Sequence, residues 1–211
     1  MQASDLYNIS AVISGLSDQY GPIVWWQGST DAVIAGAVLT QQTRWENVER
    51  ALSCLRDAGI RTIVDLHNAS VDELEKPIRC TGFYRVKARR LKNLAAHIVK
   101  NYGTPEKMAS SPTDQLREGL LAVKGVGEET ADSILCYGLS RTTFVIDAYT
   151  ERICRCAGIG AARKDLKSLF EAALQPTPEA YREAHAHIVE FAKEFCVRKR
   201  CHECWIKSLN G

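Results

Sequence analysis

Apolar residues recur along most of the chain at the three- and four-residue spacing of an α-helix, and no strand-like alternation persists. The segment from 83 to 103 shows the pattern most clearly, because its apolar side chains fall on one stripe. These residues are Leu91, Leu94, Ala95 and Ile98. Gly103 is well suited to end this helix, since glycine readily adopts the left-handed conformation that helix ends require.

Start signals divide the rest of the chain into further helices. Residues 30 to 58 have a helical pattern that breaks near the stretch "LTQQT". Ser70 and Glu73 have the spacing of a capping box, and Thr113 could cap the next helix. Thr177 followed by proline predicts the start of a long helix that runs to Cys196. We therefore predict an all-α fold with short loops.

Composition narrows this picture only modestly. The chain has 211 residues, enough for one domain or two small ones, and its 45% hydrophobic and 25% charged fractions are typical of a soluble globular protein. The net charge is +2, so any nucleic-acid-binding surface must be local. Neither a signal peptide nor a long apolar stretch is apparent, which predicts a cytoplasmic location and no membrane partner. The eight cysteines are then expected as thiols or metal ligands.

The stretch "LLAVKGVGEETADSILCYG" predicts two helices joined by the turn from Lys124 to Gly127. Two glycines separated by one residue allow a backbone path that side chains would obstruct. The N–H groups at the start of the second helix, together with the helix dipole, would favour a phosphate at this turn. A plain helix connector without a ligand is the alternative.

The residues downstream of the turn make the pattern more specific. Asp147 follows the apolar run "FVI" in "TTFVIDAYTERICRC". Together these stretches resemble the helix–hairpin–helix, Gly/Pro-rich loop and aspartate signature of the endonuclease III superfamily of DNA glycosylases. "AVLTQQT" and "CTGFYRVKARRLKNLA" are similar to earlier segments of that family, so the resemblance extends from about Ile34 to Cys204.

The resemblance implies a two-lobed helix–hairpin–helix glycosylase fold with a C-terminal cysteine loop. One lobe would span residues 32–141 and carry the hairpin, and the other would combine residues 1–31 with 142–211. The implied partner is double-stranded DNA with a damaged base, bound by a monomer across the cleft between the lobes. In a prokaryote such an enzyme would be associated with the nucleoid.

In the family, the hairpin holds the DNA backbone, a role that falls here on Gly125, Val126 and Gly127 with Lys124 beside them. Phosphate contacts of this kind are independent of DNA sequence. The catalytic aspartate falls on Asp147, whose carboxylate would stabilise the positive charge that develops on the sugar or orient an attacking water. The alternative role of Asp147, capping the following helix, is compatible with catalysis.

The main departure from the family pattern is at Glu129. Bifunctional members carry a lysine at this position as the Schiff-base nucleophile, whereas this chain reads "GVGEETA". A glutamate cannot form a Schiff base. We therefore predict a monofunctional glycosylase that uses water, with weak or absent lyase activity. Glu128 is interpreted as a first-turn acidic residue that suits the helix dipole.

The preferred base is less clearly indicated. The "VWW" stretch with Trp25 and Trp26, together with Trp45 and Glu129, is similar to the 3-methyladenine DNA glycosylase subgroup. Aromatic faces bind cations, so these residues are candidates for a pocket that takes a positively charged alkylated purine, although core packing is the alternative for the tryptophans. A glycosylase for uracil or for mismatched or damaged pyrimidines is the second hypothesis, and a non-enzymatic DNA-binding module is the third.

Flipping the base out of the duplex leaves a gap, and the family's wedge position matches Gln41, with Gln42 beside it. Basic residues are concentrated between Arg85 and Lys92, and we select Arg85 and Lys87 as candidate DNA contacts. A solvated helix face is the alternative interpretation.

Cys196, Cys201 and Cys204 form C-x4-C-x2-C where the family carries the iron–sulfur motif C-x6-C-x2-C-x5-C. The first loop is shorter here, and Asn210 stands at the fourth position, so the resemblance implies a [4Fe–4S] cluster without identifying its fourth ligand. Truncation of the chain, a non-cysteine ligand and loss of the cluster all stay open, as does a zinc site that includes His202. The other cysteines (54, 80, 136, 154 and 156) lack metal-binding spacing and are interpreted as small buried side chains.

Overall fold

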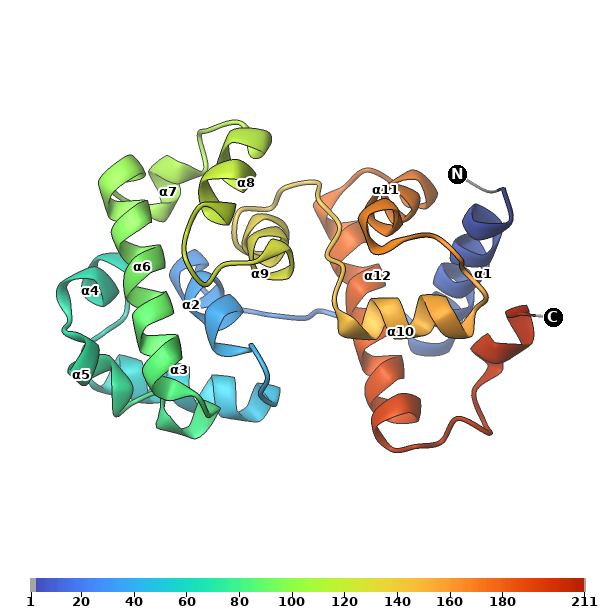
Figure 1. Cartoon of the computed structure of the whole chain (residues 1–211), viewed down its shortest axis with the longest axis horizontal. Coiled ribbons are helices and arrows are strands. Elements are labelled where there is room, and N and C mark those ends of the chain that lie inside the picture. The colour runs from blue at the N-terminus through green and yellow to red at the C-terminus, as the bar shows by residue number, and fades with distance from the viewer. Residues whose placement is uncertain (1–2, 211) are drawn as a thin grey trace. The chain divides into compact units, whose positions relative to one another are not determined.

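A computed structural model describes residues 3–210, which fold into helices and loops without a strand (Figure 1). The all-α prediction is therefore confirmed. The chain divides into two compact units: a hairpin unit from Trp26 to Ser140, and a discontinuous unit that combines the segment up to Trp25 with the chain from Arg141 onward. None of the helices within residues 3–210 is long and apolar enough to cross a membrane.

The hairpin unit is built around the long helix α6 (Tyr84–Tyr102), which packs against α2 (Thr30–Leu39), α4 (Ile63–Asn68) and α5 (Val71–Glu75). The expected apolar stripe of α6 faces this core, since Leu91, Leu94, Ala95 and Ile98 are all buried. The hairpin unit also contains three further elements: helix α3 (Trp45–Asp57), the 3-10 turn η1 (Arg79–Thr81) and helix α7 (Pro105–Met108). The chain then enters α8 (Thr113–Leu121), α9 (Glu128–Ser133) and the π-helical turn η2 (Ile134–Gly138).

Local capping explains most of these boundaries. The Ser70 side chain and Glu73 form the predicted capping box at α5, and Gly103 ends α6 with a φ of 82°. The prediction for Thr113 was wrong by one position, because Thr113 is the first residue of α8 and Pro112 occupies the cap site. The proline side chain has no oxygen that could accept a capping hydrogen bond, but its fixed φ suits the chain direction there.

The discontinuous unit packs α1 (Ala3–Tyr20) against α11 (Arg163–Ala173) and α12 (Pro178–Phe191). Thr177 caps α12 as predicted, and the helix continues as the π-helical turn η3 (Ala192–Val197) that contains Cys196. Helix α10 (Ala148–Cys156) packs against α12 and against the C-terminal 3-10 turn η4 (Trp205–Asn210). Asp147 is the N-cap of α10, so this packing fixes the position of the candidate catalytic residue within the unit.

Candidate functional site

The predicted hairpin is formed by α8, the turn and α9. Gly125 adopts a φ of 101°, which disfavours any side chain, and a Cβ there would lie 2.9 Å from Arg90 Cδ and closer still to Arg90 Cγ. Gly127 is the N-cap of α9, and no side chain of the described residues caps the helix at this point. A Cβ on Gly127 would meet no atom within 4 Å. The start of α9 therefore lies beside open surface, where its dipole favours an anion.

Side chains from the turn after α2 and from α6 hold the carbonyl groups of this turn. Gln41 donates its amide N–H to Gly125 O at 3.2 Å and to Thr130 Oγ1 at 3.0 Å, and its own oxygen accepts a hydrogen bond from Arg90. Asn93 donates to Lys124 O at 3.1 Å. These bonds make Gln41 a support of the hairpin in this structure, while a wedge role for it stays a prediction.

The neighbouring Gln42 is exposed and has a φ of 55°. Its side chain is therefore more accessible to a partner than that of Gln41, which sequence order alone did not indicate. Its DNA contact remains a prediction.

The structure contradicts the DNA contact predicted for Lys87. Its side chain is 1% exposed, and its ammonium donates to Leu39 O at 2.9 Å and to Thr81 O at 2.7 Å. Burial lowers the pKa of Lys87 to about 8. A group committed to two backbone carbonyls in the core cannot reach a phosphate, so Lys87 has a structural role. Arg85 differs, because its side chain is 71% exposed, with a 3.7 Å ion pair to Glu75 and its guanidinium 5.7 Å from the centroid of the Tyr84 ring.

The acidic pair after the turn has two distinct surroundings. Glu128 lies 3.7 Å from Arg117 and belongs to an ion pair on the surface, which fits its interpretation as a first-turn residue. Glu129 is exposed in the first turn of α9, at the position where the bifunctional family pattern has lysine. The predicted contact of Glu129 with a base stays a prediction.

Asp147 is 9% exposed, and one of its carboxylate oxygens is fully engaged. Asp147 Oδ1 accepts hydrogen bonds from the backbone N–H of Thr150 at 2.7 Å and from Thr150 Oγ1 at 2.8 Å. Arg163 donates to Ile146 O at 3.0 Å and pairs with Glu151, which fixes the backbone on both sides of Asp147. The carboxylate is thus rigidly held as a helix cap while Oδ2 takes no part in the cap.

His185, which the sequence did not single out, lies against this carboxylate. Its Nε2 is 3.7 Å from Asp147 Oδ2, a separation that suits an ion pair rather than a direct hydrogen bond. Burial alone would raise the pKa of Asp147, but His185 and the two bonds from Thr150 outweigh it and lower the pKa below its usual value. Asp147 is therefore a buried carboxylate that stays ionised. The Trp25 ring lies 5.7 Å from His185, within the same unit.

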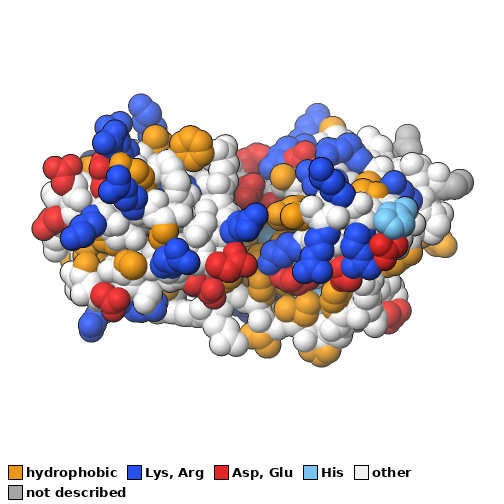
Figure 2. Space-filling view, turned by 90° about the horizontal axis from the view of Figure 1, so that it is seen from below, with side chains coloured by type: hydrophobic (Ala, Val, Ile, Leu, Met, Phe, Trp, Pro, Cys, Tyr) orange, Lys and Arg blue, Asp and Glu red, His pale blue; other side chains and the backbone are white. Residues whose placement is uncertain are grey.

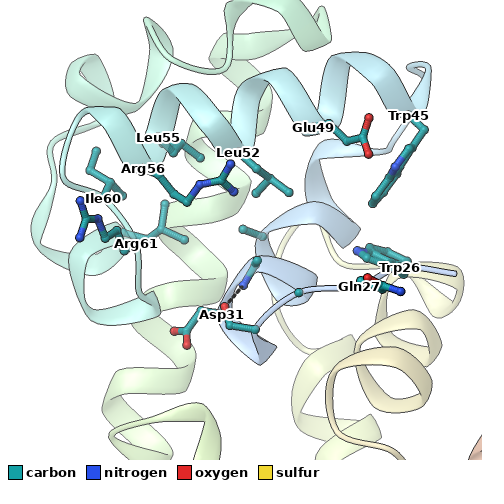
Figure 3. A pocket seen from close by; sticks show the side chains of 15 residues that line it. Trp26, Gln27, Asp31, Trp45, Glu49, Leu52, Leu55, Arg56, Ile60 and Arg61 are labelled. Atoms are coloured by element: carbon teal, nitrogen blue, oxygen red, sulfur yellow. Dashed lines mark hydrogen bonds between the residues drawn. The ribbon is translucent and has the colours of Figure 1, made fainter. Parts of the chain in front are cut away.

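The other two candidate tryptophans lie in the hairpin unit. The rings of Trp26 and Trp45 meet edge to face with centroids 5.3 Å apart, and Trp26 also contacts Tyr137 at 5.1 Å. Both line a cavity of about 390 Å³ that extends along α3 toward Leu52, as Figure 3 shows. Glu49 projects from α3 beside Trp45, so the aromatic end of the cavity also carries a carboxylate (Figure 3).

Phe83 is a second residue that sequence reasoning missed. It precedes α6 with a φ of 46°, and its side chain is 66% exposed. An aromatic residue in the left-handed region is uncommon and points to function more often than an ordinary exposed side chain does. The adjacent Gly82, with a φ of 66°, was the only sequence signal for this turn.

The C-terminal cysteines have an additional neighbour. Burial raises the pKa of the Cys196 thiol, and the nearby thiols of Cys156, Cys201 and Cys204 add to the rise, while Arg152 opposes it. The sequence predicts Cys156 as a small buried side chain without metal spacing, yet it is only half-buried.

The zinc alternative finds no support in the described part of the chain. Within it, no three metal-ligating side chains come close enough to hold one metal ion. The His202 side chain is 78% exposed and lies 3.2 Å from Glu203. None of the eight cysteines forms a disulfide.

Basic side chains on the surface are mixed with acidic ones, so any strongly basic area is small. Figure 2 shows one face on which Lys and Arg side chains are spread widely, with acidic side chains between them. The net charge of +2 reflects this mixture. Attraction to phosphate must therefore come from individual groups such as exposed Lys124 and Arg85 and from the helix start at Gly127.

Comparison with known proteins bears directly on these features. Residues 35–179 match the family described as HhH-GPD superfamily base excision DNA repair protein. A Methanocaldococcus jannaschii protein named "Putative DNA repair glycosylase MJ1434" is 46% identical over 92% of this chain and 91% of its own. Endonuclease III of Thermotoga maritima is 31% identical over 83% of this chain and 80% of its own.

Solved structures agree with these sequence relatives. The H. pylori 3-methyladenine DNA glycosylase bound to 1,N6-ethenoadenine has a TM-score of 0.76 and 30% identity, over 90% of this chain and 97% of its own. A non-covalent endonuclease III–DNA complex has a TM-score of 0.79 over 99% of this chain and 95% of its own, and its 20% identity supports the fold alone.

Proposed function

Because the chain belongs to the HhH-GPD superfamily of base excision DNA repair proteins and is a DNA glycosylase, we propose that it removes a damaged base with water and leaves the DNA backbone intact. The observation that carries this proposal is the carboxylate of Asp147, which is buried, ionised and rigidly held. The glutamate at position 129 supports the use of water, since no Schiff-base lysine stands there.

In the proposed reaction, the bond between C1′ and the base nitrogen breaks and its electron pair leaves with the base. The sugar gains positive charge, which the negative charge of Asp147 stabilises. A water molecule then forms the new C–O bond at C1′ and releases its proton to bulk solvent. Oδ1 is engaged by Thr150, so Oδ2 is the atom that would face the sugar or orient the water. His185, close to Oδ2, would keep this carboxylate ionised.

We assign the grip on the DNA backbone to the turn from Lys124 to Gly127. The positive φ of Gly125 and the open surface beside Gly127 support close approach of a phosphate to the start of α9. The amide of Gln41 holds the turn in this shape by binding Gly125 O. The exposed side chains of Phe83 and Gln42 are our candidates to fill the gap that a flipped nucleotide leaves.

For the substrate, we propose a positively charged alkylated purine such as 3-methyladenine. The aromatic contact between Trp26 and Trp45 supports this choice, because indole faces attract cations. A cationic base is also a good leaving group and needs little help from a general acid. The 30% identity to a 3-methyladenine DNA glycosylase points the same way. Removal of uracil or of a mismatched or damaged pyrimidine is the alternative, which a 24% identical relative named "Thymine/uracil-DNA glycosylase" favours.

We further propose that Cys196, Cys201 and Cys204 hold a [4Fe–4S] cluster. Their thiol chemistry and their place after α12 support it, and when bound the cluster would cross-link the C-terminal loop. Its role would be structural, because every step assigned above belongs to other side chains.

A lesion panel tests the substrate proposal. Single-turnover base release would be measured on duplexes with 3-methyladenine, uracil, or thymine opposite guanine, using the wild type, Trp45→Ala and the control Trp205→Phe. We expect release of 3-methyladenine, slowed about 5- to 30-fold in Trp45→Ala by loss of an aromatic contact of about 1–2 kcal/mol. Release of uracil or thymine without 3-methyladenine would overturn the substrate and favour the alternative.

A further inference from the structure

The buried ammonium of Lys87 joins two helix ends of the hairpin unit that lie far apart in the sequence. Its Nζ donates to Leu39 O at 2.9 Å and to Thr81 O at 2.7 Å. Leu39 is the last residue of α2, and Thr81 is the last residue of η1. Carbonyl groups at a helix end lack a partner within their own helix, so Lys87 supplies a donor to each of them. One side chain therefore holds both helix ends together.

Each of these helix ends leads directly into a turn with an exposed residue in the left-handed region. Gln42 follows Leu39 by three residues and has a φ of 55°, and Phe83 follows Thr81 by two residues and has a φ of 46°. This backbone conformation is unfavourable for both residue types, and it persists only where the surrounding structure fixes the chain. Gln42 and Phe83 are also the two residues that we assign to the gap left by a flipped nucleotide.

The turn after α2 is tied on its other side to the hairpin. Gln41 donates to Gly125 O at 3.2 Å and accepts a hydrogen bond from Arg90. Arg90 lies three residues after Lys87 on α6, so the two basic side chains start from neighbouring positions of one helix. Arg90 supports the phosphate-binding turn through Gln41, and Lys87 connects the turn after α2 with the turn before α6. The phosphate grip and the gap-filling residues are therefore parts of one hydrogen-bonded frame.

Packing alone gives no reason for a lysine at position 87. The side chain is 1% exposed, and burial, together with the charge of Arg90, lowers its pKa to about 8. An ammonium loses its hydration when it is buried, so an apolar side chain of similar size would fill this space at a lower cost in stability. The lysine adds two directed hydrogen bonds, and these fix the helix ends rather than fill a cavity.

We propose that Lys87 is a positioning residue for base flipping: by joining Leu39 O and Thr81 O, it holds Gln42 and Phe83 at the separation that lets both enter one gap in the duplex. The inference rests on the proposed gap filling by these two residues. It is independent of which base is removed and of the chemistry at Asp147. Lys87 itself touches no DNA in this role, in agreement with its burial.

The test compares the affinity for a duplex that carries a tetrahydrofuran abasic analogue with the affinity for the intact duplex, by fluorescence anisotropy. The analogue leaves a gap without a base to remove, so the ratio of the two affinities reports gap filling alone. Lys87→Met keeps an unbranched side chain without donors, and it should lower this ratio about threefold or more while the affinity for intact DNA stays unchanged. Leu94→Ala is the matched control, because it opens the core two helical turns farther along α6 and should keep the wild-type ratio.

A double-mutant cycle separates positioning from a general loosening of the fold. In a protein with both Gln42→Ala and Phe83→Ala, no gap-filling side chain is left to position, so adding Lys87→Met should not lower the ratio further. A wild-type ratio in folded Lys87→Met, or an equal further loss in that background, would overturn the inference and leave gap filling in place. A wild-type ratio in the Gln42→Ala, Phe83→Ala protein would overturn gap filling itself.

Hydrogen–deuterium exchange provides a second readout that a purely structural role would not move. The amides of residues 40–43 and 82–83 should exchange about fivefold faster or more in Lys87→Met than in the wild type, whereas Leu94→Ala should speed exchange throughout the unit. If Lys87→Met does not fold, Lys87→Gln takes its place, because it keeps a polar group at the site on a side chain one atom shorter. Faster exchange in only one of the two turns, or in neither, would overturn the inference.

Discussion

Gly125→Ala tests the hairpin most sharply, because the added methyl group destabilises the fold in two separate ways. The native φ of 101° is unfavourable for alanine, which costs about 1–2 kcal/mol. The new methyl group would also overlap the side chain of Arg90, with Cδ 2.9 Å away. Moving Arg90 breaks its bond to Gln41 and costs about 1–3 kcal/mol more. We expect Gly125→Ala to lower the free energy of unfolding by about 2–5 kcal/mol in total.

Urea unfolding of four proteins would separate the two costs. If Arg90 causes the clash, Gly125→Ala in an Arg90→Ala background should cost only the conformational part, about 1–2 kcal/mol. The coupling between the two sites should then be about 1–3 kcal/mol. Additive effects would refute the packing of Arg90 on Gly125.

Gly127→Ala is the matched control for DNA binding. Its φ of −100° suits alanine and its Cβ meets no atom within 4 Å, so the free energy of unfolding should change by less than about 1 kcal/mol. The methyl group would nevertheless occupy the surface where we place the phosphate. We expect a stable protein whose DNA affinity, measured by fluorescence anisotropy, falls at least fivefold. Unchanged affinity would refute this turn as the phosphate site.

Three further predictions concern charge. Borohydride should trap Glu129→Lys covalently on abasic DNA but should not trap the wild type, because a lysine at this position can form the Schiff base. Trapping of the wild type would disprove the monofunctional assignment. His185→Asn should move the acidic limb of the activity–pH profile to higher pH. The pKa of Asp147 rises without this neighbour, so the carboxylate is protonated at a higher pH as the pH falls. An acidic limb at the wild-type pH would show that His185 does not keep Asp147 ionised. Arg85→Ala should lower the slope of log affinity against log salt concentration by about one, if Arg85 contacts a phosphate. Lys87→Met should leave this slope unchanged and should destabilise the fold by about 2–4 kcal/mol in urea unfolding. A changed slope for Lys87→Met would restore Lys87 as a DNA contact.

Local features of the fold could be predicted because they depend on neighbours in sequence. The capping box at Ser70, the end of α6 at Gly103 and the start of α12 after Thr177 all follow from side chains within a few residues. The hairpin glycines were also recognisable, because a sharp turn between helices restricts which residues fit. The residues that support the turn were not recognisable, since Gln41, just after α2, and Arg90, on α6, are distant from it in sequence.

The errors and omissions at the candidate site have a common physical origin. Lys87 looks like part of an exposed basic helix face, but tertiary packing supplies two carbonyl acceptors that hold it inside. His185 lacks a local motif, and it meets Asp147 only when α10 and α12 pack together. Long-range packing decides such contacts, and a single sequence carries no direct record of it.

The central claim is that Asp147 performs the chemistry, and Asp147→Asn tests it most directly. Asparagine keeps the helix cap, because its side-chain oxygen can still accept from the Thr150 N–H, so the fold should be retained. The negative charge is lost, and single-turnover base release from 3-methyladenine DNA should fall by about 10²–10³-fold. A folded Asp147→Asn protein that releases the base at the wild-type rate would show that Asp147 is only a helix cap.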